Sequence, residues 1–306
     1  EACGWKLSHL QLRLSANRHK AEVRDFSLQT PQSRISQERL VAYYDASSVE
    51  KIFNSLIVEG AIEDARIATN DIAPLLPQLH PLNEILFMST QFAVRKGEVR
   101  LKNLQLSNAT DRFYLSTDAT LSLPQGKFSA ISAQLQKLSL QQHFVRSAMN
   151  ALHLKELPEW LRPLETIELK GKLRYATTHS SYFDGQIISP IGKIELNANY
   201  WKGNLTGQLS SRNLRPALLK QIPNLPTMIS LEAKGHLQLN GTTQPNGRIE
   251  LKITEVEWRQ HHYKNLATTA SLFNGKADVS LQANDPSLDL SLEAKASLDQ
   301  QWKPSL

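Results

Sequence analysis

Apolar and polar residues alternate strictly along several stretches of the chain. In 167–175, 194–200, 249–253 and 288–296, every second residue is apolar or glycine and the residues between are polar. Because successive side chains of a strand point to opposite faces, each stretch predicts a strand with one apolar and one polar face. A parallel sheet buried on both faces would give continuous apolar runs instead. The same alternation occurs at 10–14, 99–101, 104–106, 115–123, 231–239 and 277–283.

Short polar segments with glycine or asparagine separate these strands. We expect tight turns at 96–97, 124–126, 183–185, 202–204, 245–247 and 274–275. Gly and Asn adopt positive φ in such turns at low cost. Strands that recur about every 8–12 residues between such turns indicate an antiparallel all-β architecture.

Helical periodicity is confined to a few short segments. Residues 45–56 and 141–154 each carry an apolar stripe at helical spacing, and Ser47 with Glu50 forms a possible capping box. Two further segments, 71–77 and 213–219, place a proline three residues after an Asp or Asn. That order is typical of a helix start, because the first N–H groups of a helix need no intrahelical partner.

The segments 71–77 and 213–219 also match each other position by position, which indicates an internal repeat. They lie 213 − 71 = 142 residues apart, twice 71, and the predicted helix at 141–154 falls near their midpoint. We therefore expect a partial repeat at 1–66 and further repeats at 67–137, 138–208 and 209–306, the last including the start of another. Repeats that contact only their neighbours build an elongated body rather than a closed globule.

Composition narrows the class of protein without contradicting this pattern. The hydrophobic fraction of 41% is enough for a folded chain. The longest strictly apolar run, 40–44, is far shorter than the roughly 20 residues of a membrane-spanning helix. The net charge of 35 − 29 = +6 is evenly spread, as on most soluble proteins. The single cysteine, Cys3, excludes an internal disulfide framework.

The sequence carries no motif for catalysis, for a metal or for a cofactor. The nine histidines lack ligand spacing, and the adjacent pair His261–His262 would point to opposite faces of a strand. No nucleophile elbow, phosphate loop or dinucleotide fingerprint occurs. Lys170, Lys172 and Arg174 share a strand face, but without the aromatic platform that nucleic-acid binding needs. We expect no enzyme, no cofactor and no nucleic-acid partner.

The apolar faces of so many strands could be used in four ways. Two sheets could pack as a sandwich, or one sheet could close into a membrane barrel. A solenoid could fill its own interior, or a long curved sheet could form a gutter whose inner face holds a lipid. The barrel is disfavoured because the aromatic residues, 7% of the chain, are scattered instead of forming belts. Periodicity alone does not separate the sandwich from the solenoid or gutter.

Three segments resemble a known family. They are VRDFSLQTPQSRI at 23–35, IATNDIAPLLPQL at 67–79 and GEVRLKNLQL at 97–106. They resemble TamB-like proteins of the AsmA superfamily, especially those of Bacteroidota, and 212–219 has the same character. The resemblance covers most of residues 1–300 and includes no invariant catalytic residue. It implies a mainly β fold: a repeating β-groove, which is an elongated, curved antiparallel sheet of U-shaped cross-section with short helices at the repeat junctions.

The resemblance also implies a cellular role. Such proteins are anchored in the inner membrane of Gram-negative bacteria, here by a segment outside the given residues, and extend through the periplasm. They are implicated in carrying phospholipid between the inner and outer membranes, and so in outer-membrane biogenesis. The alternative role is a translocation and assembly scaffold that pairs with an Omp85-class outer-membrane barrel and its client proteins. Phospholipid is the ligand that the resemblance implies.

The apolar phase of the strands supplies the residues that we expect to line such a groove. Exposing a lipid tail to water costs about 0.8 kcal/mol per methylene, so transfer through water needs a continuous apolar surface. An ordinary sandwich core is the alternative use of the same side chains. The predicted lining is Leu10, Leu12, Val99, Leu101, Leu115, Leu121, Ile167, Leu169, Leu173, Ile194, Leu196, Leu237, Ile249, Leu251, Ile253, Leu288 and Leu290.

Overall fold

A computed structural model describes residues 6–48, 51–52, 55–73, 82–151, 164–219, 224–238, 246–273, 276–286, 288–298 and 304–305. The chain divides into two units, residues 1–157 and 158–306, each of which is described by itself. Both units consist mainly of antiparallel strands, so the predicted fold class is confirmed. The boundaries of the four repeats stay a prediction.

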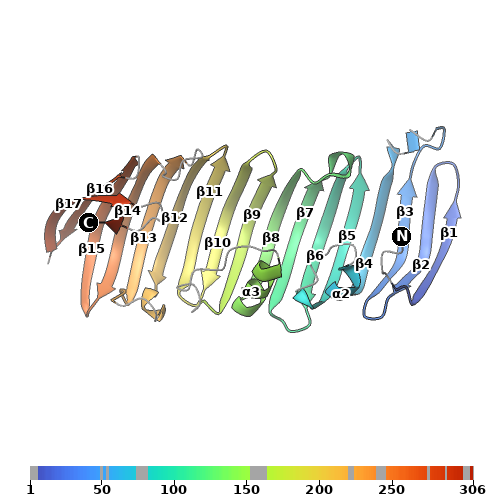
Figure 1. Ribbon diagram of the computed structural model, residues 1–306, viewed down its shortest axis with the longest axis horizontal. Helices are drawn as coiled ribbons and strands as arrows, with labels where there is room; N and C mark the ends of the chain where they lie inside the picture. Colours follow the sequence, from blue (N-terminus) through green and yellow to red (C-terminus); the bar gives the residue numbers. More distant parts are fainter. Residues whose placement is uncertain are drawn as a thin grey trace. The chain divides into compact units, whose positions relative to one another are not determined.

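The first unit forms its sheet from strands that pair in chain order (Figure 1). Short helical segments follow β4, β7 and β8: α2 (Thr69–Ile72), the 3-10 turn η2 (Pro124–Gly126) and α3 (Gln142–Ala151). The strands are β1 (His9–Ala16), β2 (Lys20–Gln29), β3 (Arg34–Tyr43), β4 (Ile57–Ala68), β5 (Ile85–Arg95), β6 (Glu98–Asn108), β7 (Phe113–Ser122) and β8 (Ala130–Gln141).

The second unit is built in the same way, with each strand antiparallel to the next. A 3-10 turn, η4 (Pro216–Leu218), follows β12. The strands are β9 (Thr166–Ala176), β10 (Ser180–Ser189), β11 (Gly192–Trp201), β12 (Asn204–Leu214), β13 (Met228–Gln238), β14 (Asn246–Trp258), β15 (His261–Phe273), β16 (Lys276–Asp285), β17 (Leu288–Leu298) and β18 (Pro304–Ser305).

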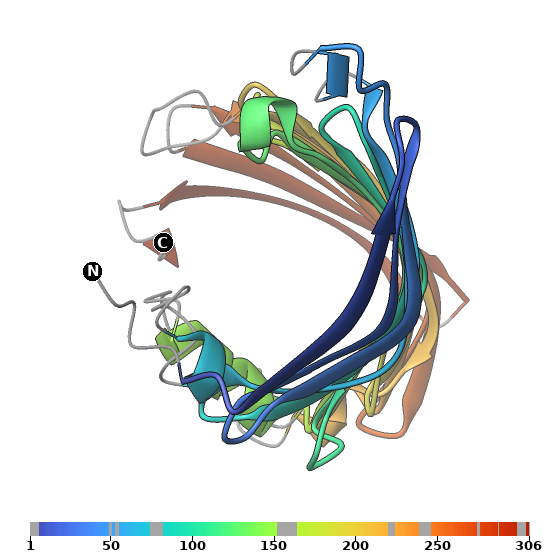
Figure 2. The ribbon, with the colours of Figure 1, turned by 90° about the vertical axis from the view of Figure 1, so that its right-hand side faces the viewer.

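Each unit contains one layer of strands. In the described residues, all strand pairings join neighbours in the chain, and β1 does not pair with β8, nor β9 with β17. The sheet of neither unit therefore closes on itself, and no second sheet faces it as a sandwich would require. Figure 2 shows that the strands are arched instead of straight.

Two of the predicted hairpin turns have the expected geometry. Lys96 and Gly97 have φ of 46° and 73°, and Lys202 and Gly203 have φ of 44° and 86°. Two successive left-handed residues are the signature of a two-residue turn that matches the twist of its strands. The segment 124–126 is also a turn, as η2. Of the turn predicted at 245–247, Asn246 and Gly247 instead begin strand β14, and Pro245 lies outside the described residues, as does the segment 274–275.

The turn predicted at 183–185 is wrong, because these residues lie in the middle of β10. Gly185 there pairs with Gly171 of β9. A Cβ at Gly185 would collide with the carbonyl oxygen of Lys170 and lie 2.8 Å from the Cα of Gly171. Glycine therefore serves a close approach of two backbones at this position, which is its second common use in strands.

The helix predictions have mixed outcomes. The predicted helix at 141–154 is confirmed as α3 up to Ala151, and 152–154 lie outside the described residues. Within 45–56, residues 51, 52 and 55 are helical, whereas 49–50 and 53–54 lie outside. The helix start predicted at Asp71 is wrong: α2 begins at Thr69, contains Asp71 and ends at Ile72, and 74–77 lie outside the described residues.

The helix start predicted at Asn213 is wrong. Asn213 belongs to β12 and has a left-handed φ of 55°. The register between β12 and β13 shifts at this position. Only Pro216–Leu218 of the predicted segment are helical, as one 3-10 turn. Asn213 is therefore the extra residue of a bulge in β12, not the cap of a helix.

The same left-handed residue recurs in four strands. Asp25, Asn103, Asn213 and Asn265 have φ between 50° and 56°, and each follows Lys or Arg and precedes Phe or Leu. The strand register shifts at the first three of them. Such a bulge bends its strand and adds one residue, so the alternation changes phase while the apolar residues stay on the same face. The bulges therefore help to arch the strands.

Candidate functional site

Strand register gathers the apolar residues of the second unit on one face of its sheet. Residues that are directly opposite in paired strands share a face. One row that crosses the sheet from β9 to β17 consists of Leu169, Ile187, Ile194, Ser211, Leu231, Ile253, Leu266, Ala283 and Leu290. The next row consists of Gly171, Gly185, Leu196, Leu209, Ala233, Leu251, Thr268, Leu281 and Leu292.

The predicted lining residues of this unit all belong to that apolar face. The alternation within β9 places Ile167 and Leu173 beside Leu169, and Leu288 faces Asp285 next to Leu290. The remaining members share the face by direct register: Ile194, Leu196, Leu237, Ile249, Leu251 and Ile253.

The first unit has a corresponding apolar face. One row runs through Val94, Val99, Leu121 and Ile131 of β5 to β8. The predicted residues Leu101 and Leu115 lie in other rows of the same face, opposite Phe92 and Leu106. Leu10 of β1 is opposite Leu28 of β2, and Leu12 shares its face. All predicted lining residues are therefore brought onto the apolar face of their own unit.

Exposure distinguishes the apolar face from the opposite one. In β13, Leu231, Ala233, Gly235 and Leu237 are half-buried, whereas the residues that alternate with them, 232, 234, 236 and 238, are exposed. Side chains on the inside of a bent sheet converge and shield one another, whereas those on the outside diverge. The strands are arched (Figure 2), and the more shielded apolar face is the one expected on the inside of the bend, so we call it the inner face.

Convergence is visible at Gly60 of β4 in the first unit. A Cβ at Gly60 would collide with the amide nitrogen of Gln37 and lie 2.9 Å from Cζ of Phe92. Gln37 and Phe92 belong to the strands on either side, β3 and β5. Both side chains lean over the glycine, as expected on a concave surface.

The inner faces lack the large buried core of a globular protein. Thirteen apolar residues are buried in the described part of the chain, and seven of them are alanines. Large apolar side chains such as Leu196 and Leu251 consequently stay partly accessible.

Polar residues interrupt the inner face at a few buried positions, and the backbone satisfies them. The Thr90 hydroxyl donates to the Lys102 carbonyl at 3.2 Å, and Thr117 donates to Gln134 O at 2.9 Å. Ser211 donates to Lys193 O at 2.6 Å. Because these hydroxyls already have partners, they leave the inner face effectively apolar.

The opposite, outer face carries charges that are paired across strands. Lys234 Nζ lies 2.9 Å from Glu250 Oε2, and Arg248 Nε lies 3.3 Å from Glu250 Oε1. The hydrogen bond from Lys234 is the main reason that the pKa of Glu250 lies below its usual range. The predicted polar face of these strands therefore carries Glu250 in an ion-pair network.

A shallow depression of about 1000 Å³ lies over the outer face of the second unit. From each of β10 to β14 it is lined by three consecutive residues, of which the outer two are polar, as in Glu232-Ala233-Lys234. Residues two apart share a face of a strand, so the depression runs between two rows of polar side chains. Its charged members include the paired Lys234 and Glu250.

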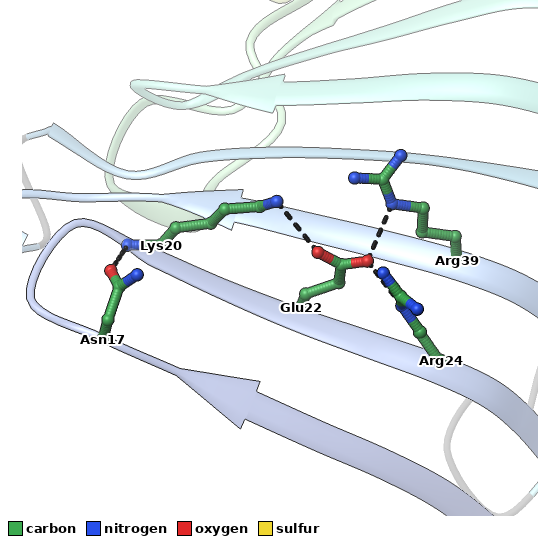
Figure 3. A network of polar contacts seen from close by, with 5 residues as sticks. All are labelled: Asn17, Lys20, Glu22, Arg24 and Arg39. Atoms are coloured by element: carbon green, nitrogen blue, oxygen red, sulfur yellow. Dashed lines mark hydrogen bonds and ion pairs between the residues drawn. The ribbon is translucent and has the colours of Figure 1, made fainter.

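An ion cluster occupies the outer face of the first unit (Figure 3). Glu22 accepts hydrogen bonds from Lys20 Nζ at 2.8 Å, Arg24 Nε at 2.6 Å and Arg39 Nε at 3.0 Å. Lys20 and then Arg24 contribute most to lowering the pKa of Glu22 to about 2. Arg24 and Arg39 are directly opposite each other in β2 and β3, where two like charges would repel. Glu22 bridges them, so the cluster holds these strands in register.

Two small helical elements are fixed to the ends of the strands. The Phe144 ring of α3 stacks on Phe113 of β7, with ring centroids 4.8 Å apart. Asp71 of α2 accepts hydrogen bonds from the Thr30 hydroxyl, from Ser33 Oγ at 2.7 Å and from Gln32 N at 3.0 Å. Partial burial acts to raise the pKa of Asp71, but these hydrogen bonds outweigh it and lower the pKa.

Sequence reasoning missed part of the inner face. Phe183, Ile187, Leu209 and Leu266 lie in the same rows as the predicted residues. The assumed turn at 183–185 concealed the first two, and Thr268 or a bulge interrupts the alternation near the others. These latter residues could have been found from a short sequence motif, Lys or Arg followed by Asn or Asp and then by Leu or Phe. The motif marks a bulge, after which the apolar residues move from odd to even positions or the reverse.

The rest of the described structure offers no competing chemical site. No cluster of three or more His, Cys, Asp or Glu residues that could hold a metal occurs in it. None of its helices has the length and apolar character needed to cross a membrane. Comparison of the chain with protein-family models, with curated proteins and with solved structures gave no match.

Proposed function

We propose that the inner apolar face is a groove that carries the acyl chains of phospholipid. In this proposal the chain is a segment of a periplasmic bridge, attached to the inner membrane, that moves phospholipid between the inner and outer membranes of a Gram-negative bacterium. The observation that carries the proposal is the set of predominantly apolar rows from β9 to β17, which contain no charged residue and whose leucine and isoleucine side chains remain partly accessible. The resemblance of 23–35, 67–79 and 97–106 to TamB-like proteins supports it.

The energetics of lipid transfer suit such a surface. An acyl chain with 16 methylenes costs about 13 kcal/mol to expose fully to water. A single pocket would release the chain into water at its rim, whereas a continuous apolar surface lets it slide at nearly constant free energy. The headgroup would stay in water on the open side of the sheet. No covalent bond changes, so this role requires no catalytic residue.

Site-specific photo-crosslinking tests the groove. A photoreactive amino acid at Leu251, on the inner face, should capture phospholipid in cells, as detected by mass spectrometry of the crosslinked chain. The matched control is the adjacent Lys252, which is exposed on the outer face. Absence of lipid at position 251, or equal capture at 251 and 252, would contradict the proposal.

A second candidate function is favoured by the edge of β1 that faces away from β2. Leu10, Leu12 and Leu14 are 49%, 44% and 65% exposed, and no described strand pairs with β1 beyond β2. A free edge with exposed apolar side chains accepts an added strand. An assembly scaffold that pairs with an Omp85-class barrel or its clients would use this edge and would need no groove. Gln11→Pro should abolish strand addition and leave lipid capture at position 251 unchanged.

A further inference from the structure

Exposed aromatic side chains gather at one edge of the second unit. Tyr175, Trp201 and Phe273 are 46%, 50% and 68% exposed. Trp201 is opposite Ser180 and Asn204, and Phe273 is opposite Lys276. All three aromatic residues therefore lie where strands end at the same edge of the sheet, which we call the aromatic edge. With about 4.8 Å between strands, Trp201 lies about 10 Å from β9 and about 19 Å from β15 along this edge.

Cations accompany these aromatic side chains. The Lys202 ammonium lies 5.2 Å from the centroid of the Trp201 ring. Lys276 and Arg174 are exposed next to Phe273 and Tyr175. Within the described part of this edge, which comprises 174–182, 199–206, 236–238, 246–248, 271–273 and 276–278, Asp278 is the sole acidic residue. The aromatic edge is therefore both apolar and cationic.

The opposite edge of the same unit has a different character. Acidic residues such as Glu257 and Asp289 lie there beside Arg215 and Arg259. Its exposed tryptophan, Trp258, donates its indole N–H to the Asn224 carbonyl at 3.1 Å, so this ring has a partner within the protein. Arg259 also lies over the Trp258 ring, 4.9 Å from its centroid, as Lys202 lies over Trp201. The aromatic edge therefore differs from the opposite edge in its shortage of acidic residues and in its larger number of exposed aromatic rings.

We propose that the aromatic edge docks on the surface of a phospholipid bilayer with anionic headgroups. Trp and Tyr rings favour the headgroup region because they combine an apolar body with a polar group. Phe273 would insert among the upper acyl segments, and Lys202 and Lys276 would bind anionic headgroups. The proposal goes beyond the groove, since it concerns the strand ends of the second unit and not the inner face.

Vesicle binding by the whole chain tests the docking. The chain should sediment with vesicles that contain phosphatidylglycerol, and less with pure phosphatidylcholine or at high salt. The double variant Trp201→Ser, Phe273→Ser should lower the partition coefficient at least tenfold, because it removes two exposed aromatic groups that docking would bury in the bilayer. Lys202→Asn and Lys276→Gln should each lower it about fivefold. Asn suits the left-handed φ of 44° at position 202.

Matched variants keep the result interpretable. Leu218→Ser removes a 44% exposed leucine from the opposite edge and should leave vesicle binding unchanged. Leu251→Asp should abolish acyl-chain capture and also leave vesicle binding unchanged, so docking and groove can fail separately. Unfolding midpoints within about 2 °C of the unaltered chain will show that the edge variants are folded.

Two results would overturn the docking proposal. The first is a double aromatic variant that binds anionic vesicles as well as the unaltered chain does. The second is an unaltered chain that binds no vesicle of either composition, which would assign the edge to a protein partner instead.

Discussion

The two faces of each sheet differ in polarity and in exposure to solvent. In β13, half-buried Leu231 and Leu237 alternate with exposed Glu232 and Lys234, although all four share one backbone. The outer face balances its charges across strands, as Lys234 does with Glu250. The inner face has no charged residue in the rows that cross β9 to β17, and its buried hydroxyls bond the backbone.

This difference explains why each sheet remains a single layer. A charged outer face is costly to cover with another apolar layer, because its charges would have to leave water. The inner face is apolar, but the bend brings its side chains together, so they shield one another in part. An apolar surface of this kind is suited to a ligand that lacks polar groups along its length.

The largest expected effect comes from placing a charge on the inner face. Leu251→Asp should lower the binding of an acyl-chain fluorophore more than tenfold, because a carboxylate in contact with a methylene chain must be desolvated. Lys252→Asp, one residue away on the outer face, should change binding less than twofold. Equal losses for both variants would mean that the two faces do not differ in ligand binding.

An intermediate effect should follow from a disturbed bulge. Asn103 has a φ of 51°, and its N–H donates to Asp118 Oδ1 at 2.7 Å. Asn103→Val should lower the free energy of unfolding by about 1–2 kcal/mol, because a β-branched residue is strained in the left-handed region. Asn103→Gly should cost less. Urea denaturation measures both, and equal losses would show that the left-handed conformation is not the cause.

The smallest effect should come from the ion cluster on the outer face, and it depends on pH. The pKa of Glu22 is lowered to about 2 from an ordinary value of 4.5. The ionised form therefore stabilises the folded chain above pH 4.5, and this stabilisation is lost as the pH falls towards 2. The urea midpoints of the unaltered chain and Glu22→Gln should differ at pH 7 and converge near pH 2. A difference that does not change with pH would refute this account.

The alternation of apolar and polar residues predicted most of the strands. It also predicted which side chains of a strand share its apolar face. It succeeded at Leu169, Leu196 and Leu251 because the direction of a strand side chain depends only on local backbone geometry. The predictions at 183–185 and at Asn213 were wrong because glycine and asparagine each serve more than one structure. Gly185 allows β9 and β10 to approach closely, and Asn213 forms a bulge. The partner strand decides between such uses, and a local pattern does not contain it.

The sequence by itself determined that the protein is built from antiparallel strands with one apolar and one polar face. It also determined which side chains share a face, since that depends on residues two positions apart. Only the tertiary structure decided what the apolar face meets, because this depends on pairing and bending over many strands. The bulges at Asp25, Asn103 and Asn213 bend strands in each unit, and the convergence over Gly60 places the apolar face of the first unit on the inside of the bend. For this reason the same alternating pattern that would build a sandwich core is found here in single layers, without a second sheet among the described residues.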